Sequence, residues 1–191
     1  MGIKETLAIM NAMEADGVIE RYSIAGAVAA YNYVEAGVTE DLDVLVSFGP
    51  RSDEHMSGMM TLEPLFAYLK AKGYSGFRKE GLVVEGWPVQ FLPVASDLDA
   101  EALERAVEIS IDQASGSVVS RVLRPEHIVA IALRVARPKD LLRIAQFLEA
   151  KAVDPEALCG VLKRHGLLPS WRAFCSRTGI SDPCKNNGET P

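Results

Sequence analysis

The last third of the chain constrains the fold most, because its apolar residues recur at helical spacing throughout. Four helical segments follow one another, and each begins with a proline near its first turn, where the missing backbone N–H costs nothing. They are residues 125–134, 138–151, 155–165 and 169–177. Residues 178–191, rich in Gly, Pro, Asn and Ser, are expected to form a flexible tail.

The first two thirds alternate helix and strand patterns. Three strands in the middle of this stretch are joined by short turns, which predicts an antiparallel meander and not a βαβ crossover. The fold class is therefore α+β, with a small mixed sheet flanked by helices and followed by a C-terminal helical bundle. We place the boundaries at 1–123 for the core, 124–177 for the helical region and 178–191 for the tail. The expected order is helix 3–15, strand 22–25, helix 26–35, strand 42–48, helix 61–72, strands 76–79, 82–85 and 89–94, helix 99–109 and strand 118–123.

Composition points to a self-sufficient core. With 48% hydrophobic residues among 191, the chain can bury a sizeable core without disulfides or a structural metal. The longest apolar run, residues 24–31, is far below the roughly 20 residues of a membrane helix. No basic-then-apolar segment opens the chain, so we expect a cytoplasmic location and no membrane partner. The odd number and wide spacing of Cys159, Cys175 and Cys184 predict reduced thiols, with a structural metal as the alternative.

Charge is distributed unevenly along the chain. Residues 1–100 carry 7 Lys and Arg against 15 Asp and Glu, whereas residues 134–177 carry 9 against 4. An acidic half and a basic half suit a cleft that binds a metal–phosphate ligand. Two solvated surfaces of different composition would explain the same numbers equally well.

The segment Asp41-Leu42-Asp43-Val44 opens an apolar strand. Residues two apart in a strand point the same way and lie roughly 6.6 Å apart, so Asp41 and Asp43 project together while Leu42 and Val44 enter the core. Two such carboxylates can ligate one or two Mg²⁺ ions, which prefer oxygen ligands and retain substrate phosphates. The alternative is a pair of solvated charges at a strand edge.

Gly26 lies between a predicted strand and a predicted helix start. Free N–H groups and the helix dipole favour an anion there, and the missing side chain lets a phosphate approach the backbone. Simple close packing is the alternative for this glycine. Taken together, Gly26, Asp41 and Asp43 predict a triphosphate that reaches from the Gly26-Ala27 turn to a metal on the two carboxylates.

These residues resemble the signature of the polymerase-β-like nucleotidyltransferase superfamily, in which a Gly followed by Gly or Ser precedes an Asp-x-Asp or Asp-x-Glu strand. A closer likeness is to bacterial and archaeal nucleotidyltransferases related to abortive-infection toxins and to the minimal nucleotidyltransferases. Their Thr-x-Asp-Leu-Asp strand, a later strand ending in Leu-Pro and a helical tail with Arg-x-Lys-Asp match residues 39–43, 89–93 and 137–140. The resemblance covers roughly residues 20–150.

The resemblance implies that residues 1–123 form a nucleotidyltransferase-like core. It also implies an NTP donor, Mg²⁺ or Mn²⁺ as cofactor, and transfer of a nucleotidyl group to a protein, tRNA end or small molecule. By position, Asp41 and Asp43 would be the catalytic and metal-binding residues. The nucleotide would be bound by Gly26, Ala27, Thr39 and Lys139.

Two positions depart from the family pattern. Ala27 replaces the second Gly or Ser, and Gln90 stands where the later strand usually carries a third carboxylate. An amide can lend an oxygen to a metal but cannot act as a base. Either Glu85, one strand earlier, substitutes for it, or the enzyme is slow, or the chain has no catalytic activity.

The first hypothesis for the function is nucleotidyl transfer. The second is a catalytically silent relative that holds a nucleotide or a partner protein in a toxin–antitoxin or defence system. A third interpretation assigns every charge to solubility. The apolar helices of the tail could also pack against another subunit, which would make the protein a homo-oligomer.

Overall fold

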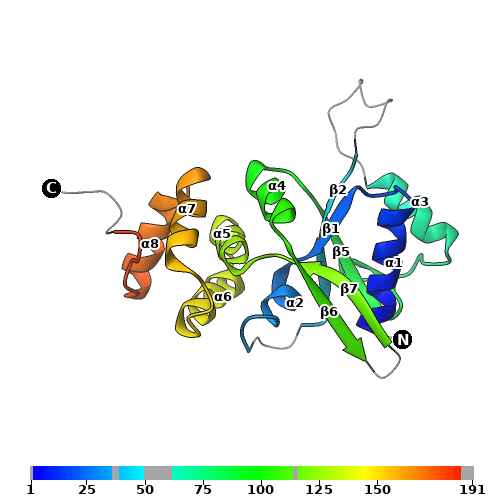
Figure 1. Ribbon diagram of the computed structural model, residues 1–191, viewed down its shortest axis with the longest axis horizontal. Coiled ribbons are helices and arrows are strands. Elements are labelled where there is room, and N and C mark those ends of the chain that lie inside the picture. The colour runs from blue at the N-terminus through cyan, green and yellow to red at the C-terminus, as the bar shows by residue number, and fades with distance from the viewer. Residues whose placement is uncertain (1, 36–38, 50–61, 114–115, 186–191) are drawn as a thin grey trace. The chain divides into compact units, whose positions relative to one another are not determined.

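The chain divides into two compact units. The structure is a computed structural model that describes residues 2–35, 39–49, 62–113 and 116–185 (Figure 1). Unit 1 comprises Met1–Ala29 with Gly37–Leu123, and unit 2 comprises Ala30–Ala36 with Arg124–Pro191. Unit 1 holds a mixed sheet with helices beside it, and unit 2 is helical. This content confirms the predicted α+β class.

The described part of unit 1 contains one seven-stranded sheet in the order β3-β4-β5-β2-β1-β7-β6. The pairs β2–β5 and β1–β7 are parallel, and the other neighbours are antiparallel. The predicted meander is confirmed, since β3, β4 and β5 pair antiparallel in sequence. The strands are β1 (Arg21–Ile24), β2 (Leu42–Ser47), β3 (Phe77–Arg78), β4 (Gly81–Val84), β5 (Trp87–Pro93), β6 (Val107–Gln113) and β7 (Gly116–Val122).

Helices lie on both faces of this sheet (Figure 1). α1 (Ile3–Ala15) buries Leu7, Met10 and Met13 against β1 and β7. α3 (Glu63–Ala71) is on the same side as α1, and its Phe66 meets Phe91 of β5 edge-on at 6.2 Å. α4 (Asp97–Glu104) packs on β1 and β2 from the other side. On this second face of β2, Leu45 is buried and Asp43 is partly buried.

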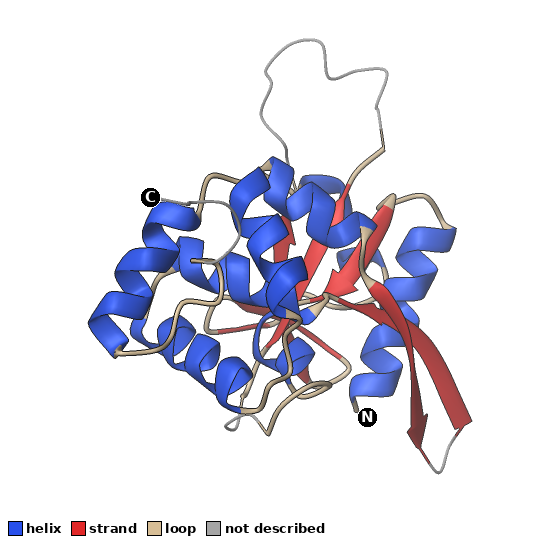
Figure 2. Cartoon of the chain, turned by 60° about the vertical axis from the view of Figure 1, so that its left-hand side comes forward, coloured by secondary structure: helices blue, strands red, loops and turns tan. Residues whose placement is uncertain are grey.

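Two expected helices are shorter in the structure. α2 (Gly26–Ala30) ends five residues before the predicted position, where residues 31–33 form turns instead. α4 ends at Glu104, so the predicted helix 99–109 is wrong over its second half. There Val107, Ile109 and Ile111 alternate with polar residues, and β6 pairs residue by residue with β7. Figure 2 shows these two strands as a long hairpin. A period of two over so few residues does not by itself exclude a helix.

Unit 2 contains the four predicted helices, each with a proline at its first or second position. Phe147, Leu158, Trp171 and Phe174 form its core and are at most 2% exposed. No helix in the described ranges is long and apolar enough to cross a membrane. The helices are α5 (Pro125–Val135), α6 (Pro138–Glu149), α7 (Pro155–Arg164) and α8 (Leu168–Thr178).

A disulfide joins Cys159 of α7 to Cys184, with their Cα atoms 5.5 Å apart. The prediction of reduced thiols is therefore wrong for these two residues, and only Cys175 is a free, buried thiol. The two half-cystines are separated by 25 residues and form no recognisable spacing motif. They meet because the chain turns back after α8, which the sequence pattern did not indicate. Residues 179–185, expected to be part of a flexible tail, are thus attached to α7.

Candidate functional site

Asp43 lies on β2, and Asp41 directly precedes this strand. Leu42 and Val44 are fully buried, whereas Asp43 between them is only partly buried, as is Asp41 just before the strand. The strand alternation therefore sends the Asp43 side chain to the face opposite Leu42 and Val44, away from α1 and α3, whereas Asp41 lies one residue before the strand. Thr39 Oγ1 donates a hydrogen bond of 2.7 Å to Asp41 Oδ1. Thr39 thus orients one of the two carboxylates.

Gly26 lies directly against Asp43. β1 runs antiparallel to β2, with Ile24 opposite Val44, and the Ala25 N–H donates to the Asp43 carbonyl at 2.9 Å. Gly26 has φ +59°, and a Cβ at this position would be 1.9 Å from Asp43 Oδ2. Backbone conformation and space therefore both require glycine here.

This contact gives Gly26 a role that differs in part from the sequence-based hypothesis. The glycine makes room for the Asp43 carboxylate itself, in addition to any phosphate that approaches the turn. The helix that follows has five residues, so its dipole is weaker than that of the longer helix expected from the sequence. Ala27 lies in the first turn of this short helix.

Gln90 lies beside Asp43. The two residues are paired in register between the parallel strands β2 and β5, so their side chains leave the sheet on the same face. The Gln90 Nε2 donates to Glu80 Oε2 at 3.3 Å. Glu80 belongs to the two-residue turn between β3 and β4, and sequence reasoning did not select it. Besides Asp43, the acidic residue that contacts Gln90 is thus Glu80 and not Glu85.

A pocket of about 170 Å³ opens on this face of the sheet. Asp41 lines this pocket and Asp43 does not. The lining combines carboxylates with cations, which is the mixture expected for a ligand that contains phosphate groups and a metal ion. Arg78 and Lys79 were also missed by the sequence reasoning, although the run of charges over residues 78–80 at a turn was a usable signal. The lining residues are Glu40, Asp41, Arg78, Lys79, Glu80, Gly81, Pro88 and Gln90.

An ion pair connects two of these lining residues. Lys79 Nζ and Glu40 Oε2 are 2.7 Å apart, and both side chains are 71% exposed. Their hydrogen bond, followed by their mutual attraction, lowers the pKa of Glu40 and raises the pKa of Lys79. Solvent screens such a pair strongly, so an anionic ligand can compete with Glu40 for the lysine at small cost.

Glu85 lies in the turn between β4 and β5, where it and Gly86 both have positive φ. Its carboxylate accepts a hydrogen bond from Tyr74 Oη. This bond, helped by burial, raises the pKa of Tyr74 to about 12. Glu85 is not among the residues that line the pocket beside Asp41 and Gln90.

Lys139 belongs to unit 2, where it is exposed in the first turn of α6. The neighbouring Arg137 forms an ion pair of 2.7 Å with Asp140, which is 2% exposed. This ion pair within unit 2 is a sufficient structural explanation for an aspartate at position 140.

The side chains around β2 provide oxygen atoms of the kind that a metal ion binds. Across residues 2–35, 39–49, 62–113 and 116–185, no three His, Cys, Asp or Glu side chains are grouped closely enough to hold an ion. Asp41 and Asp43 supply hard carboxylate oxygens, and the Gln90 amide adds a neutral one. Such a sparse set fits Mg²⁺ or Mn²⁺, which keep several waters and take further oxygens from substrate phosphates.

No protein-family model matches the chain, and no curated protein sequence matches it significantly. The nucleotidyltransferase interpretation therefore depends on the quoted motif residues and on the geometry around β2.

Proposed function

We propose that unit 1 binds a nucleoside triphosphate with Mg²⁺ or Mn²⁺ and transfers its nucleotidyl group to an acceptor hydroxyl. The observation that carries the proposal is the position of Asp41 and Asp43 at the start of β2, with Gly26 packed against Asp43. Gly26 leaves space for one carboxylate of an Asp-x-Asp pair. A functional carboxylate explains this close packing better than a solvated charge does. The adjoining pocket supplies the mixed charges that such a ligand needs.

The residues would divide the work as follows. Asp41, oriented by Thr39, and Asp43 would hold the cation, which stabilises the attacking and leaving oxygens of the displacement. Arg78 and Lys79 would neutralise phosphate charge. The acceptor oxygen would attack the α-phosphorus while the bond to the bridging oxygen breaks and pyrophosphate leaves.

The proton of the acceptor hydroxyl needs a base, and Gln90 cannot provide one. Glu80 is the carboxylate that the structure brings to Gln90. Held by the amide and lining the pocket, Glu80 would take this proton. The candidate acceptors are a protein, a tRNA end and a small molecule.

Isothermal titration with Mg²⁺ and each of the four common NTPs tests the proposal. Wild-type protein should bind at least one of them, and Asp43→Asn should weaken binding by roughly tenfold or more. Glu104→Gln removes the same charge from a residue outside this pocket and should leave the affinity unchanged. Absence of binding to every NTP, or equal affinity in Asp43→Asn, would refute the proposal.

A second candidate follows from Gln90, since the structure pairs this amide with Asp43. The chain could hold a nucleotide, or a partner protein of a toxin–antitoxin or defence system, without turnover. Gln90→Asp discriminates between the two functions. Activity that appears only in this variant would identify the native chain as a silent binder.

We also propose a cytoplasmic location. Disulfides that form in a reducing compartment are commonly transient or redox-sensing, and the Cys159–Cys184 bond would then belong to that class.

A further inference from the structure

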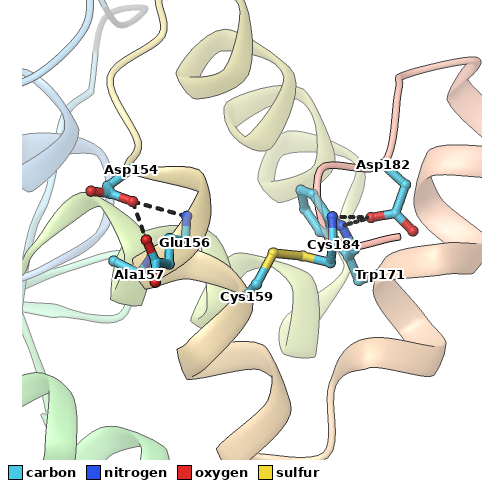
Figure 3. Close-up of a disulfide and its surroundings, with 7 residues drawn as sticks. All are labelled: Asp154, Glu156, Ala157, Cys159, Trp171, Asp182 and Cys184. Carbon is cyan, nitrogen blue, oxygen red and sulfur yellow. Dashed lines mark hydrogen bonds between the residues drawn. A yellow bond between two sulfur atoms is a disulfide. The ribbon is translucent and has the colours of Figure 1, made fainter. Parts of the chain in front are cut away.

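The disulfide joins two parts of unit 2 that differ in how firmly they are held. Cys159 lies within α7, whose N-terminus is capped by Asp154 through hydrogen bonds of 2.9 and 3.0 Å from two backbone N–H groups (Figure 3). Cys184 lies in the short irregular segment 179–185, which we call the C-terminal segment. If the bond breaks, the C-terminal segment is therefore the part that is free to move.

In the described part of unit 2, a covalent bond and a side-chain hydrogen bond connect the C-terminal segment to the helices. One is the disulfide itself, and the other is the hydrogen bond of 2.9 Å from Trp171 Nε1 to Asp182 Oδ1. The same oxygen accepts the Cys184 N–H at 2.9 Å, which fixes the turn that carries the half-cystine (Figure 3). A hydrogen bond of this kind contributes only about 1 kcal/mol, so the covalent disulfide is the stronger of these two attachments.

The C-terminal segment lies beside the third cysteine. Cys175 of α8 is 4% exposed, and it lines a pocket of about 220 Å³ together with Gly179, Ile180, Asp182 and Lys185. One wall of this pocket is the helix and the other is the segment. Burial, and then the negative charge of Asp182, raise the pKa of the Cys175 thiol to about 11. Under the segment, Cys175 is both shielded and protonated, and so unreactive.

We propose that the Cys159–Cys184 disulfide is a redox latch, which holds the C-terminal segment over Cys175 and releases it on reduction. A dithiol reductant supplies two electrons and two protons. The S–S bond breaks, Cys159 and Cys184 become thiols, and the reductant closes its own disulfide. The segment then leaves α8, and Cys175 gains access to solvent. The redox state of one cysteine pair thus controls the reactivity of another cysteine.

Thiol labelling of the whole chain tests this mechanism. Air-oxidised protein is treated with N-ethylmaleimide under native conditions, and adducts are located by peptide mass spectrometry. Cys175 should stay unmodified in the oxidised chain and react at least about tenfold faster after reduction. Cys184→Ser, and independently Cys159→Ser, should show the fast rate at Cys175 without any reductant.

Peptide-level hydrogen exchange separates release of the segment from unfolding of the unit. In Cys184→Ser, faster exchange should be confined to the C-terminal segment and the adjoining end of α8. Equal Cys175 labelling in the oxidised and reduced chains would overturn the proposal. So would faster exchange throughout α5 to α8, or three reactive thiols in the air-oxidised protein.

Discussion

Replacing Gly26 by alanine should damage unit 1 in a way that other glycine substitutions do not. At φ +59° an alanine pays the left-handed penalty of about 1–2 kcal/mol. The new Cβ would also be 1.9 Å from Asp43 Oδ2, so the carboxylate must rotate or the strand must shift. Overpacking of this kind adds about 1–3 kcal/mol.

Gly17→Ala is the matched control. Gly17 has φ +70°, and a Cβ there would meet no atom within 4 Å. It therefore carries the backbone penalty without the contact with Asp43. The lower conformational entropy of unfolded alanine stabilises both variants by about the same amount, up to roughly 1 kcal/mol, and cancels in the comparison. We expect Gly26→Ala to be less stable than Gly17→Ala by about 1–3 kcal/mol.

Urea denaturation in a Trp171→Phe background measures this difference. The chain has two tryptophans, so Trp87 on β5 then reports on unit 1 alone. The slope of the free energy of unfolding against urea should be the same in both variants. Cation–nucleotide affinity should fall in Gly26→Ala and stay unchanged in Gly17→Ala. Equal stabilities, or equal affinities, would refute the reasoning about Gly26 and Asp43.

Three further predictions concern stability and titration. Loss of the disulfide in Cys184→Ser should lower the free energy of unfolding of unit 2 by up to about 3.5 kcal/mol, because the bond spans 25 residues; a calorimetric midpoint unchanged from wild type would contradict this. Asp154→Ala removes the cap of α7 and should cost about 1 kcal/mol in chemical denaturation, whereas no loss would show that water replaces the cap. Tyr74 should titrate near pH 12 in ultraviolet difference spectra, and Glu85→Gln should return its pKa towards 10. Since its folded pKa is raised, its contribution to stability is complete below pH 10 and disappears as the pH rises through 12; an unshifted titration in the wild type would exclude the hydrogen bond.

Much of the fold can be predicted from local patterns in the sequence. Four prolines mark the starts of α5 to α8, and they predicted all four helices to within a few residues. The pattern around Asp43 likewise predicted that Leu42 and Val44 are buried. These features are local, since helix starts and strand faces depend on residues only a few positions apart.

The features that sequence reasoning missed depend on contacts between distant segments. β6 is a strand because β7 pairs with it, and its own pattern is too short to exclude a helix. Glu80 approaches Gln90 only after β3, β4 and β5 have formed the meander. The Cys159–Cys184 bond likewise requires the chain to turn back after α8, which no spacing rule encodes.

The most direct test of the central claim is to locate a bound cation. Mn²⁺ added with ATP to isotope-labelled protein broadens the amide resonances of nearby residues. We predict selective broadening around Gly26, Asp43 and Gln90, which should disappear in Asp43→Asn and persist in Glu104→Gln. Broadening centred elsewhere in the chain, or none at saturating Mn²⁺ and ATP, would contradict the assignment of Asp41 and Asp43 as a metal–nucleotide site.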